Sequence, residues 1–231
     1  MADFRHEAIL YRGESQFLER VVPFIRDGLA TGEPTLVMVN RRKIDALRET
    51  IGIDGDGLID YRDMGLVGAN PARIIPAWNE FAVEGAHRGA LHMRGVGEPI
   101  WPGRAAAQLE ECHWHEALIN RAFARLPGFW LICPYDVEAL DPKVLVEARY
   151  THPLVTDGMV VDSCSAEAAR QEFVVPTAPL ASPLPAPDGV VAALGFDLGT
   201  LGKVRALVAA VDSHVSGSTV VMSFARSQIA A

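Results

Sequence analysis

Cysteine is scarce in this sequence: the 231 residues include only Cys112, Cys133 and Cys164, which are odd in number and widely separated. Proteins held together by disulfides carry paired cysteines at close spacing, so these positions do not predict a disulfide framework. The first residues also lack the charged and then apolar pattern of a secretory signal peptide. We therefore expect a protein of the reducing cytoplasm.

Long apolar runs and an excess of basic charge are missing as well. No stretch of about 18 uncharged apolar residues occurs, so the sequence predicts no transmembrane helix. The 21 lysines and arginines are outnumbered by 29 aspartates and glutamates, which gives a net charge of −8. Because phosphate groups are bound by clustered lysine and arginine, this balance argues against nucleic acid and anionic membranes as partners.

A phosphate-binding loop is also absent. After the first expected strand the chain reads Arg12-Gly-Glu-Ser-Gln-Phe17, without the G-x-x-x-x-G-K-[ST] pattern that cradles a nucleoside triphosphate. Gly95-Val-Gly97 lacks the third glycine of a dinucleotide-binding fingerprint. No serine or cysteine in the candidate site described below has a base evident from the sequence, so nucleophilic catalysis is not predicted.

What the sequence does contain is a regular alternation of strand and helix signals. Apolar runs of strand length occur at 8–11, 35–39, 58–61, 90–93 and 129–133. Helical patterns occur at about 17–29, through Ile44 and Leu47, after Asn70-Pro71, and at about 105–126 and 137–148. Pro23 should kink the first of these helices or mark its first turn. The alternation predicts an α/β fold with a mostly parallel sheet flanked by helices.

The composition changes towards the end of the chain. Five prolines lie between Val174 and Gly189 with almost no charge, a composition typical of an extended linker. We therefore divide the chain into an α/β domain over 1–160, a Pro-rich linker over 161–189 and a short α+β segment over 190–231. A segment of about forty residues rarely buries enough surface to fold alone, so the last part looks like a piece of a domain.

Polar residues cluster at the ends of the expected strands, where an open α/β sheet presents its ligand-binding loops. Arg94 ends a strand, Glu98 follows in a loop, and Glu116 and Asn120 share one face of the next helix. Because a buried carboxylate needs a cation or several donors, we expect Arg94 to be the partner of these acids. The functional interpretation is a polar pocket floor; the structural alternative is an ion-pair network that fixes the loop.

Five further residues are considered for the site. Trp101 and Tyr135 would form the apolar walls of the pocket. Cys112 and His115 share a helix face and could reach one ion, but no second Cys/His pair at ligand spacing lies nearby, so we expect no metal site. His152, which precedes a proline, is interpreted as a structural cap rather than a catalyst.

The order of these motifs resembles one family, the MEDS (methanogen/methylotroph DcmR sensory) domain, over roughly residues 5–160. The resemblance rests on the stretch from His6 to Tyr11 and on Arg94 with Gly97-Glu98 and Trp101, Glu116 with Asn120, Cys133-Pro-Tyr135-Asp136, and Thr151-His152-Pro153. It implies an α/β sensory domain, distantly similar to RecA/KaiC-like ATPases without their phosphate loop, that binds a small, hydrocarbon-derived ligand. We expect the ligand site to comprise Arg94, Glu98, Trp101, Glu116, Asn120, Tyr135, Asp136 and His152.

The end of the chain carries a second resemblance. Residues 196–205, the helical pattern after them and residues 220–231 look like the opening of a histidine-kinase-like ATPase domain of the anti-sigma regulatory factor type. Gln228 stands where that family has a glutamate, and the chain stops before the Mg²⁺-binding asparagine and the glycine-rich loops. Because an amide cannot act as a general base, we expect a truncated remnant without ATPase or kinase activity.

The sequence thus predicts a cytoplasmic sensory or regulatory protein that binds a small molecule, uses no cofactor and acts through protein contacts. By resemblance, the setting is signal transduction or sigma-factor control, with a sigma factor or an anti-anti-sigma factor as partner and a homodimer left open. One rival is an enzyme, either a hydrolase or a degenerate nucleotide-binding protein, that uses Arg94, Glu98 and Glu116. The other is a pure interaction module that holds no ligand.

Overall fold

The computed structural model describes residues 4–52, 57–157 and 160–162. Every described element belongs to one compact unit, which lies within Met1–Glu172. The segment predicted at 190–231, and all but the first two residues of the linker predicted at 161–189, lie outside the described residues.

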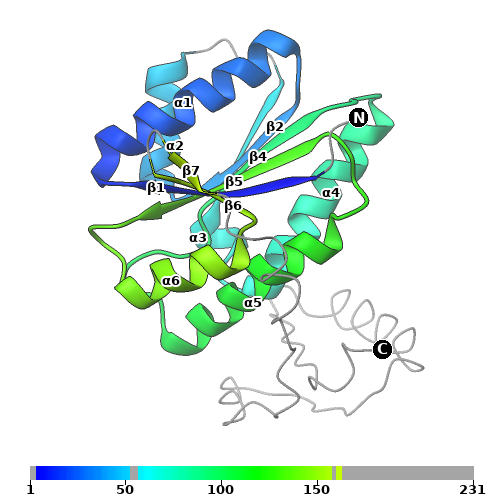
Figure 1. Cartoon of the computed structure of the whole chain (residues 1–231). Helices are drawn as coiled ribbons and strands as arrows, with labels where there is room; N and C mark the ends of the chain where they lie inside the picture. Colours follow the sequence, from blue (N-terminus) through cyan, green and yellow to red (C-terminus); the bar gives the residue numbers. More distant parts are fainter. Residues whose placement is uncertain (1–3, 53–56, 158–159, 163–231) are drawn as a thin grey trace, which may run out of the picture. The chain divides into compact units, whose positions relative to one another are not determined.

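Six parallel strands and one short antiparallel strand form a single sheet (Figure 1). The strands are β1 (Arg5–Tyr11), β2 (Thr35–Val39), β3 (Ile59–Asp63), β4 (Met93–Gly97), β5 (Phe129–Asp136), β6 (Leu154–Asp157) and β7 (Val160–Asp162). Their order across the sheet is β3-β2-β4-β5-β1-β6-β7, and only β7 runs against its neighbour. The predicted α/β fold with a mostly parallel sheet is confirmed.

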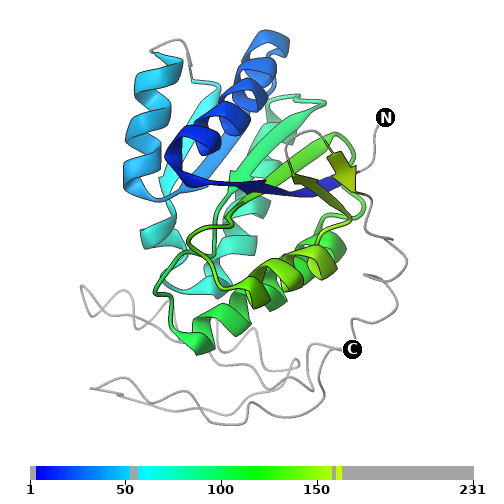
Figure 2. The ribbon, with the colours of Figure 1, turned by 60° about the vertical axis from the view of Figure 1, so that its left-hand side comes forward.

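Helices cover both faces of the sheet, as Figures 1 and 2 show. One face carries α1 (Gly13–Thr31) and α2 (Arg41–Ile51), and its core includes Phe17, Ile25, Leu47, Val37 and Val39. The other face carries α3 (Met64–Val67), the 3₁₀ turn η1 (Pro71–Arg73), α4 (Ile74–His87), α5 (Ala106–Ala122) and α6 (Pro142–Thr151). The strands alternate buried side chains between the two cores, as expected for a sheet covered on both sides. Among the described helices, none has the length and apolar character needed to cross a bilayer.

Local signals set most of the helix boundaries, and two expectations need correction. Gly32, in the left-handed conformation with φ 72°, ends α1 where the sequence predicts. Pro23 lies well inside α1, which begins at Gly13, so the alternative that it marks the first turn is wrong. The last helix begins at Pro142 rather than near residue 137, because Asp141 accepts a hydrogen bond from the backbone N–H of Lys143 and caps it there.

Strand β4 also differs from the prediction. It was expected at 90–93 but runs from Met93 to Gly97, because its glycines conceal the strand pattern. A Cβ atom on Gly95 or on Gly97 would lie 2.8 Å from ring atoms of Trp78, so both glycines let this indole of α4 pack directly onto the strand. The two glycines therefore serve helix packing inside the sheet, which explains the missing third glycine of a nucleotide fingerprint.

Candidate functional site

Six side chains form a polar cluster between the sheet and helices α5 and α6. Alternation along the strands turns His6 of β1, and Cys133 and Tyr135 of β5, towards the same face. Helix α5 supplies Glu116 and, one turn later, Asn120, while His152 follows the last residue of α6. We call these residues the Glu116 cluster: His6, Glu116, Asn120, Cys133, Tyr135 and His152. All are buried except the half-buried Asn120, and Glu116 and His152 have no exposed surface.

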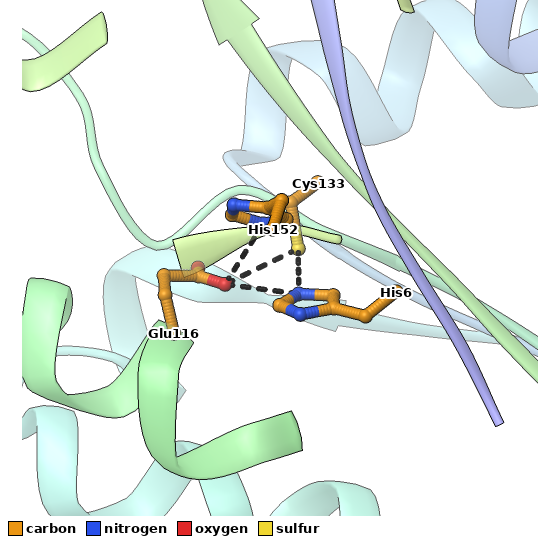
Figure 3. Close-up of side chains that lie close together, drawn as sticks. All are labelled: His6, Glu116, Cys133 and His152. Carbon is orange, nitrogen blue, oxygen red and sulfur yellow. Dashed lines mark hydrogen bonds and ion pairs between the residues drawn. The ribbon is translucent and has the colours of Figure 1, made fainter. Parts of the chain in front are cut away.

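One carboxylate oxygen, Oε2 of Glu116, lies at the centre of this cluster (Figure 3). It is 3.1 Å from Nε2 of His6 and 3.2 Å from Nε2 of His152. The Sγ atom of Cys133 lies 3.5 Å from the same oxygen and 3.3 Å from Nε2 of His6. The contact of His152 lacks hydrogen-bond geometry, although the two atoms are close.

The outer contacts of the two histidines fix where their protons lie. The amide nitrogen of Asn120 donates to the carbonyl of Thr151 at 2.7 Å, which leaves its Oδ1 to accept from Nδ1 of His6 at 3.0 Å. Nδ1 of His152 faces the carbonyl of Ala148 at 2.9 Å and must also carry a proton. In neutral imidazoles, both Nε2 atoms would therefore be unprotonated, and both lie close to Oε2 of Glu116.

Burial governs the ionisation of these groups. Burial raises the pKa of Cys133 well above its ordinary value, and the charge of Glu116 adds to this effect. Burial lowers the pKa of His6, and the neighbouring His152 lowers it further. For Glu116, burial alone would raise the pKa, but the contacts with His152 and His6 outweigh it and hold the pKa well below the ordinary value. Burial thus keeps the thiol neutral, whereas Glu116 stays ionised only while a proton or another cation lies between its carboxylate and the two histidines.

Three atoms of the cluster have no hydrogen-bond partner among the described residues. They are the second carboxylate oxygen of Glu116, Oε1, the hydroxyl of Tyr135 and Nε2 of His152. The Tyr135 ring packs edge-on against the His152 ring, with centroids 5.6 Å apart. Leaving a buried polar group unpaired costs about 1–3 kcal/mol, so this arrangement is expensive for stability alone.

A second polar cluster lies at the carboxyl ends of the strands, on the opposite face. We call it the Lys43 cluster: Tyr11, Lys43 and Glu98. Nζ of Lys43 lies 2.5 and 2.7 Å from the two carboxylate oxygens of Glu98 and 2.5 Å from the Tyr11 hydroxyl, which itself donates to Glu98 at 2.6 Å. Asp136 ends β5 opposite Tyr11, and its charge adds to the burial that raises the pKa of Glu98. Three acceptors thus use all three ammonium protons.

Arg94 does not pair with Glu98 or Glu116, contrary to the expectation from sequence. Its Nε binds Glu33 at 2.6 Å, and its guanidinium also donates to the carbonyl of Phe24 at 2.9 Å. Arg94 and Glu98 are four residues apart along an extended strand, which separates them by about 13 Å. Glu116 lies on the other face of the sheet. The predicted site therefore divides into three separate networks.

The remaining candidate residues also lie apart. The Trp101 ring stacks on the guanidinium of Arg104 at 3.9 Å rather than pairing with Tyr135 as a pocket wall. Cys112 contacts the carbonyl of Pro99, and burial raises the pKa of its thiol to about 12. Burial lowers the pKa of His115, on the same helix, to about 4. Neither residue belongs to the group of ligand-type atoms that converge around Glu116.

Sequence reasoning missed four members of these clusters. His6, Tyr11 and Cys133 appear in the motifs but were not assigned to the site, although each places a polar group in an apolar strand. Lys43 gave no signal, because a lysine in a polar helix is ordinary. Its role depends on α2 beginning next to the end of β4, where the backbone N–H of Glu98 bonds to the carbonyl of Met38.

Comparison with known families supports the motif-based resemblance. A model of the MEDS domain, the methanogen/methylotroph, DcmR sensory domain, matches residues 5–153. This chain belongs to the MEDS family. The match contains all members of the Glu116 and Lys43 clusters, and it gives the domain a sensory or regulatory role. Searches among curated proteins and among solved structures give no significant match.

Proposed function

We propose that this MEDS domain is a non-enzymatic sensor that binds a small ligand at the Glu116 cluster and reports the binding through a protein contact. The observation that carries the proposal is a set of three buried, unpartnered atoms: Oε1 of Glu116, the Tyr135 hydroxyl and Nε2 of His152. Well-packed apolar residues often replace buried charge networks at no cost in stability, so such a cluster in a core points to a role other than folding.

The Lys43 cluster is a weaker candidate for ligand binding. Its lysine, carboxylate and phenol bind one another, and none of their polar atoms is left buried without a partner. A ligand there would have to break an ion pair that already satisfies both charges. The Glu116 cluster, in contrast, offers groups whose hydrogen-bonding capacity is unused.

The geometry gives little support to the rival enzyme. Arg94, Glu98 and Glu116, which that enzyme would need together, bind different partners in different places. A single residue, Arg12, separates β1 from α1, so no loop is present there to surround a phosphate. We infer that the domain signals by a change in its contacts, in the setting of signal transduction or sigma-factor control, with a sigma factor or anti-anti-sigma factor as partner. The cytoplasm, which we propose as its location, would keep Cys133 reduced.

A thermal-shift screen of the full chain tests the proposal. The probes are short alcohols, aldehydes and carboxylic acids, the simple hydrocarbon derivatives that the family resemblance implies. A ligand at a hundred times its dissociation constant adds about 2.7 kcal/mol, which should raise the melting temperature by about 5–10 °C. Glu116→Gln should abolish the shift, while Glu98→Gln, which changes a carboxylate of similar burial in the Lys43 cluster, should retain it.

The two variants also define the results that contradict the proposal. A ligand shift lost in Glu98→Gln but kept in Glu116→Gln would move the site to the carboxyl ends of the strands. No shift with any probe class, in protein whose fold is intact by circular dichroism, would favour the pure interaction module.

A further inference from the structure

We propose that the Glu116 cluster is a metal site, in which His6, Glu116, Cys133 and His152 hold one divalent transition-metal ion of the zinc type. This proposal rests on the sensing role proposed above, because that role explains why the domain would hold a metal ion here. It departs from the expectation of no metal, which considered only Cys112 and His115. The four residues come from β1, α5, β5 and the end of α6, so no local spacing in the sequence reveals them.

Four of the six distances between the candidate ligand atoms are close to those of a tetrahedral ion, and the other two, from Nε2 of His152 to His6 and to Cys133, are at most 4.8 Å. Metal–ligand bonds of about 2.0–2.3 Å to nitrogen, oxygen and sulfur place neighbouring ligand atoms about 3.3–3.6 Å apart. The measured separations are 3.1 Å and 3.2 Å from Oε2 of Glu116 to the two Nε2 atoms, and 3.3 Å and 3.5 Å from Sγ of Cys133 to His6 and Glu116. All four atoms lie within 4.8 Å of one another.

The tautomers of the two histidines agree with the same assignment. With both Nδ1 atoms donating outwards, to Asn120 and to the carbonyl of Ala148, two unprotonated imidazole nitrogens lie close to one carboxylate oxygen (Figure 3). Without a cation these groups repel, and the one thiol proton of Cys133 cannot satisfy all of them. Histidine ligands of metals commonly donate their other ring N–H to a carbonyl or carboxylate, so Asn120 and Ala148 occupy the positions of outer-shell partners.

The donor set also selects the class of ion. Thiolate and imidazole ligands favour zinc and its neighbours in the first transition series, whereas magnesium and calcium require oxygen ligands throughout. Four protein ligands complete a tetrahedron, which is the arrangement of structural zinc sites rather than of catalytic ones. On binding, the ion would take the place of the thiol proton of Cys133, which would leave to solvent.

Metal content and a cobalt spectrum of the full chain test the proposal. We expect protein purified without chelators to contain one zinc ion per chain, and Co²⁺ added to stripped protein to give the visible bands of a tetrahedral site with a near-ultraviolet thiolate-to-cobalt band. Cys133→Ser should lose the thiolate band, and His152→Gln should weaken binding by about tenfold or more. The matched controls are Cys112→Ser and His115→Gln, which change a buried cysteine and a buried histidine on α5 outside the four ligands.

The outer-shell variant Asn120→Ala keeps all four ligands and should weaken cobalt binding by about 10–100-fold, which also separates metal affinity from loss of folding. Wild-type protein that gives neither zinc nor a tetrahedral cobalt spectrum would overturn the proposal, and the cluster would then be a proton-sharing network. The proposal would also be overturned if the thiolate band were lost in Cys112→Ser but kept in Cys133→Ser.

The thermal-shift screen, repeated with stripped and zinc-loaded protein, separates the two proposals. Ligand shifts that depend on Glu116 but not on zinc would refute the metal site and leave the sensor intact. Stoichiometric zinc without any ligand shift would support the metal site and refute small-molecule sensing at this cluster.

Discussion

Removing the charge of Lys43 should destabilise the domain strongly, because its partner Glu98 cannot reach water. The side chains of Lys43 and Glu98 are 14% and 5% exposed, and the ammonium lies within 2.7 Å of both carboxylate oxygens. Lys43→Met leaves the carboxylate with only the Tyr11 hydroxyl. Stranding a buried charge in this way costs about 3–5 kcal/mol, so we expect a loss of that order in the free energy of unfolding.

The double variant distinguishes a stranded charge from lost packing. Glu98→Gln in the Lys43→Met background removes the unpaired charge, and its amide oxygen can still accept from Tyr11. We expect the double variant to recover at least about 2 kcal/mol relative to Lys43→Met alone, because residues in direct contact are not additive. Urea unfolding of the full chain, followed by tryptophan fluorescence and circular dichroism, measures all three variants. Additive losses would refute the view that Glu98 depends on Lys43.

The same variants predict a pH dependence. Burial raises the pKa of Glu98 above its ordinary value of 4.5, and the attraction of Lys43 only partly offsets this. The folded protein therefore binds this proton more tightly than the unfolded chain does. The contribution of Glu98 to the free energy of unfolding is fully present below pH 4.5. It decreases as the pH rises from 4.5 through the raised pKa, and above that pKa it no longer changes with pH. Glu98→Gln should remove this component, seen as the difference between the two stability curves.

Four other predictions concern the rest of the chain. Arg94→Ala should cost about 3 kcal/mol and be non-additive with Glu33→Gln in urea unfolding; additivity would show that this pair contributes nothing jointly. Gly97→Ala should cost about 1–3 kcal/mol through its clash with Trp78, and Trp78→Phe should restore part of that loss; an unchanged stability would mean that the indole moves freely. Calorimetry should detect no Mg-ATP binding, and micromolar binding would revive the nucleotide-binding alternative. A chain that ends at Phe173 should melt within a few degrees of the full chain, whereas aggregation would identify the removed residues as an interaction element.

The sequence by itself was sufficient for the fold class, although the short strands β6 and β7 were not predicted. A strand that is buried on both faces has a continuous apolar run, as at 35–39. A helix that is buried on one face has an apolar stripe, as at Phe17, Val21 and Ile25. Both patterns are local in the sequence. Gly32 and Asn70-Pro71 mark helix ends through backbone conformation, which is also local. The strand at 93–97 was misplaced because its two glycines have no side chains that would reveal a period, although their role becomes clear once Trp78 lies above them.

The sequence also identified five of the nine residues of the two polar clusters, but it could not pair them. Glu98, Glu116, Asn120, Tyr135 and His152 were all selected before any contact was known, because polar side chains at strand ends and helix faces are visible along the chain. Which group faces which depends on the order of the strands and on the face to which each side chain points. That order places β1 beside β5, although 117 residues lie between Tyr11, the last residue of β1, and Phe129, the first residue of β5, and so brings His6 next to Cys133.

Tertiary structure alone therefore decided the chemistry of the site. Arg94, the cation that the sequence offered to the acids, lies about 13 Å along the strand from Glu98 and on the opposite face from Glu116, so it binds Glu33 instead. Lys43 takes its place beside Glu98, and two histidines lie beside Glu116, each from an element distant in sequence from its partner. Local periodicity determines which residues are buried, whereas the balance of buried charges is settled only when distant elements pack together.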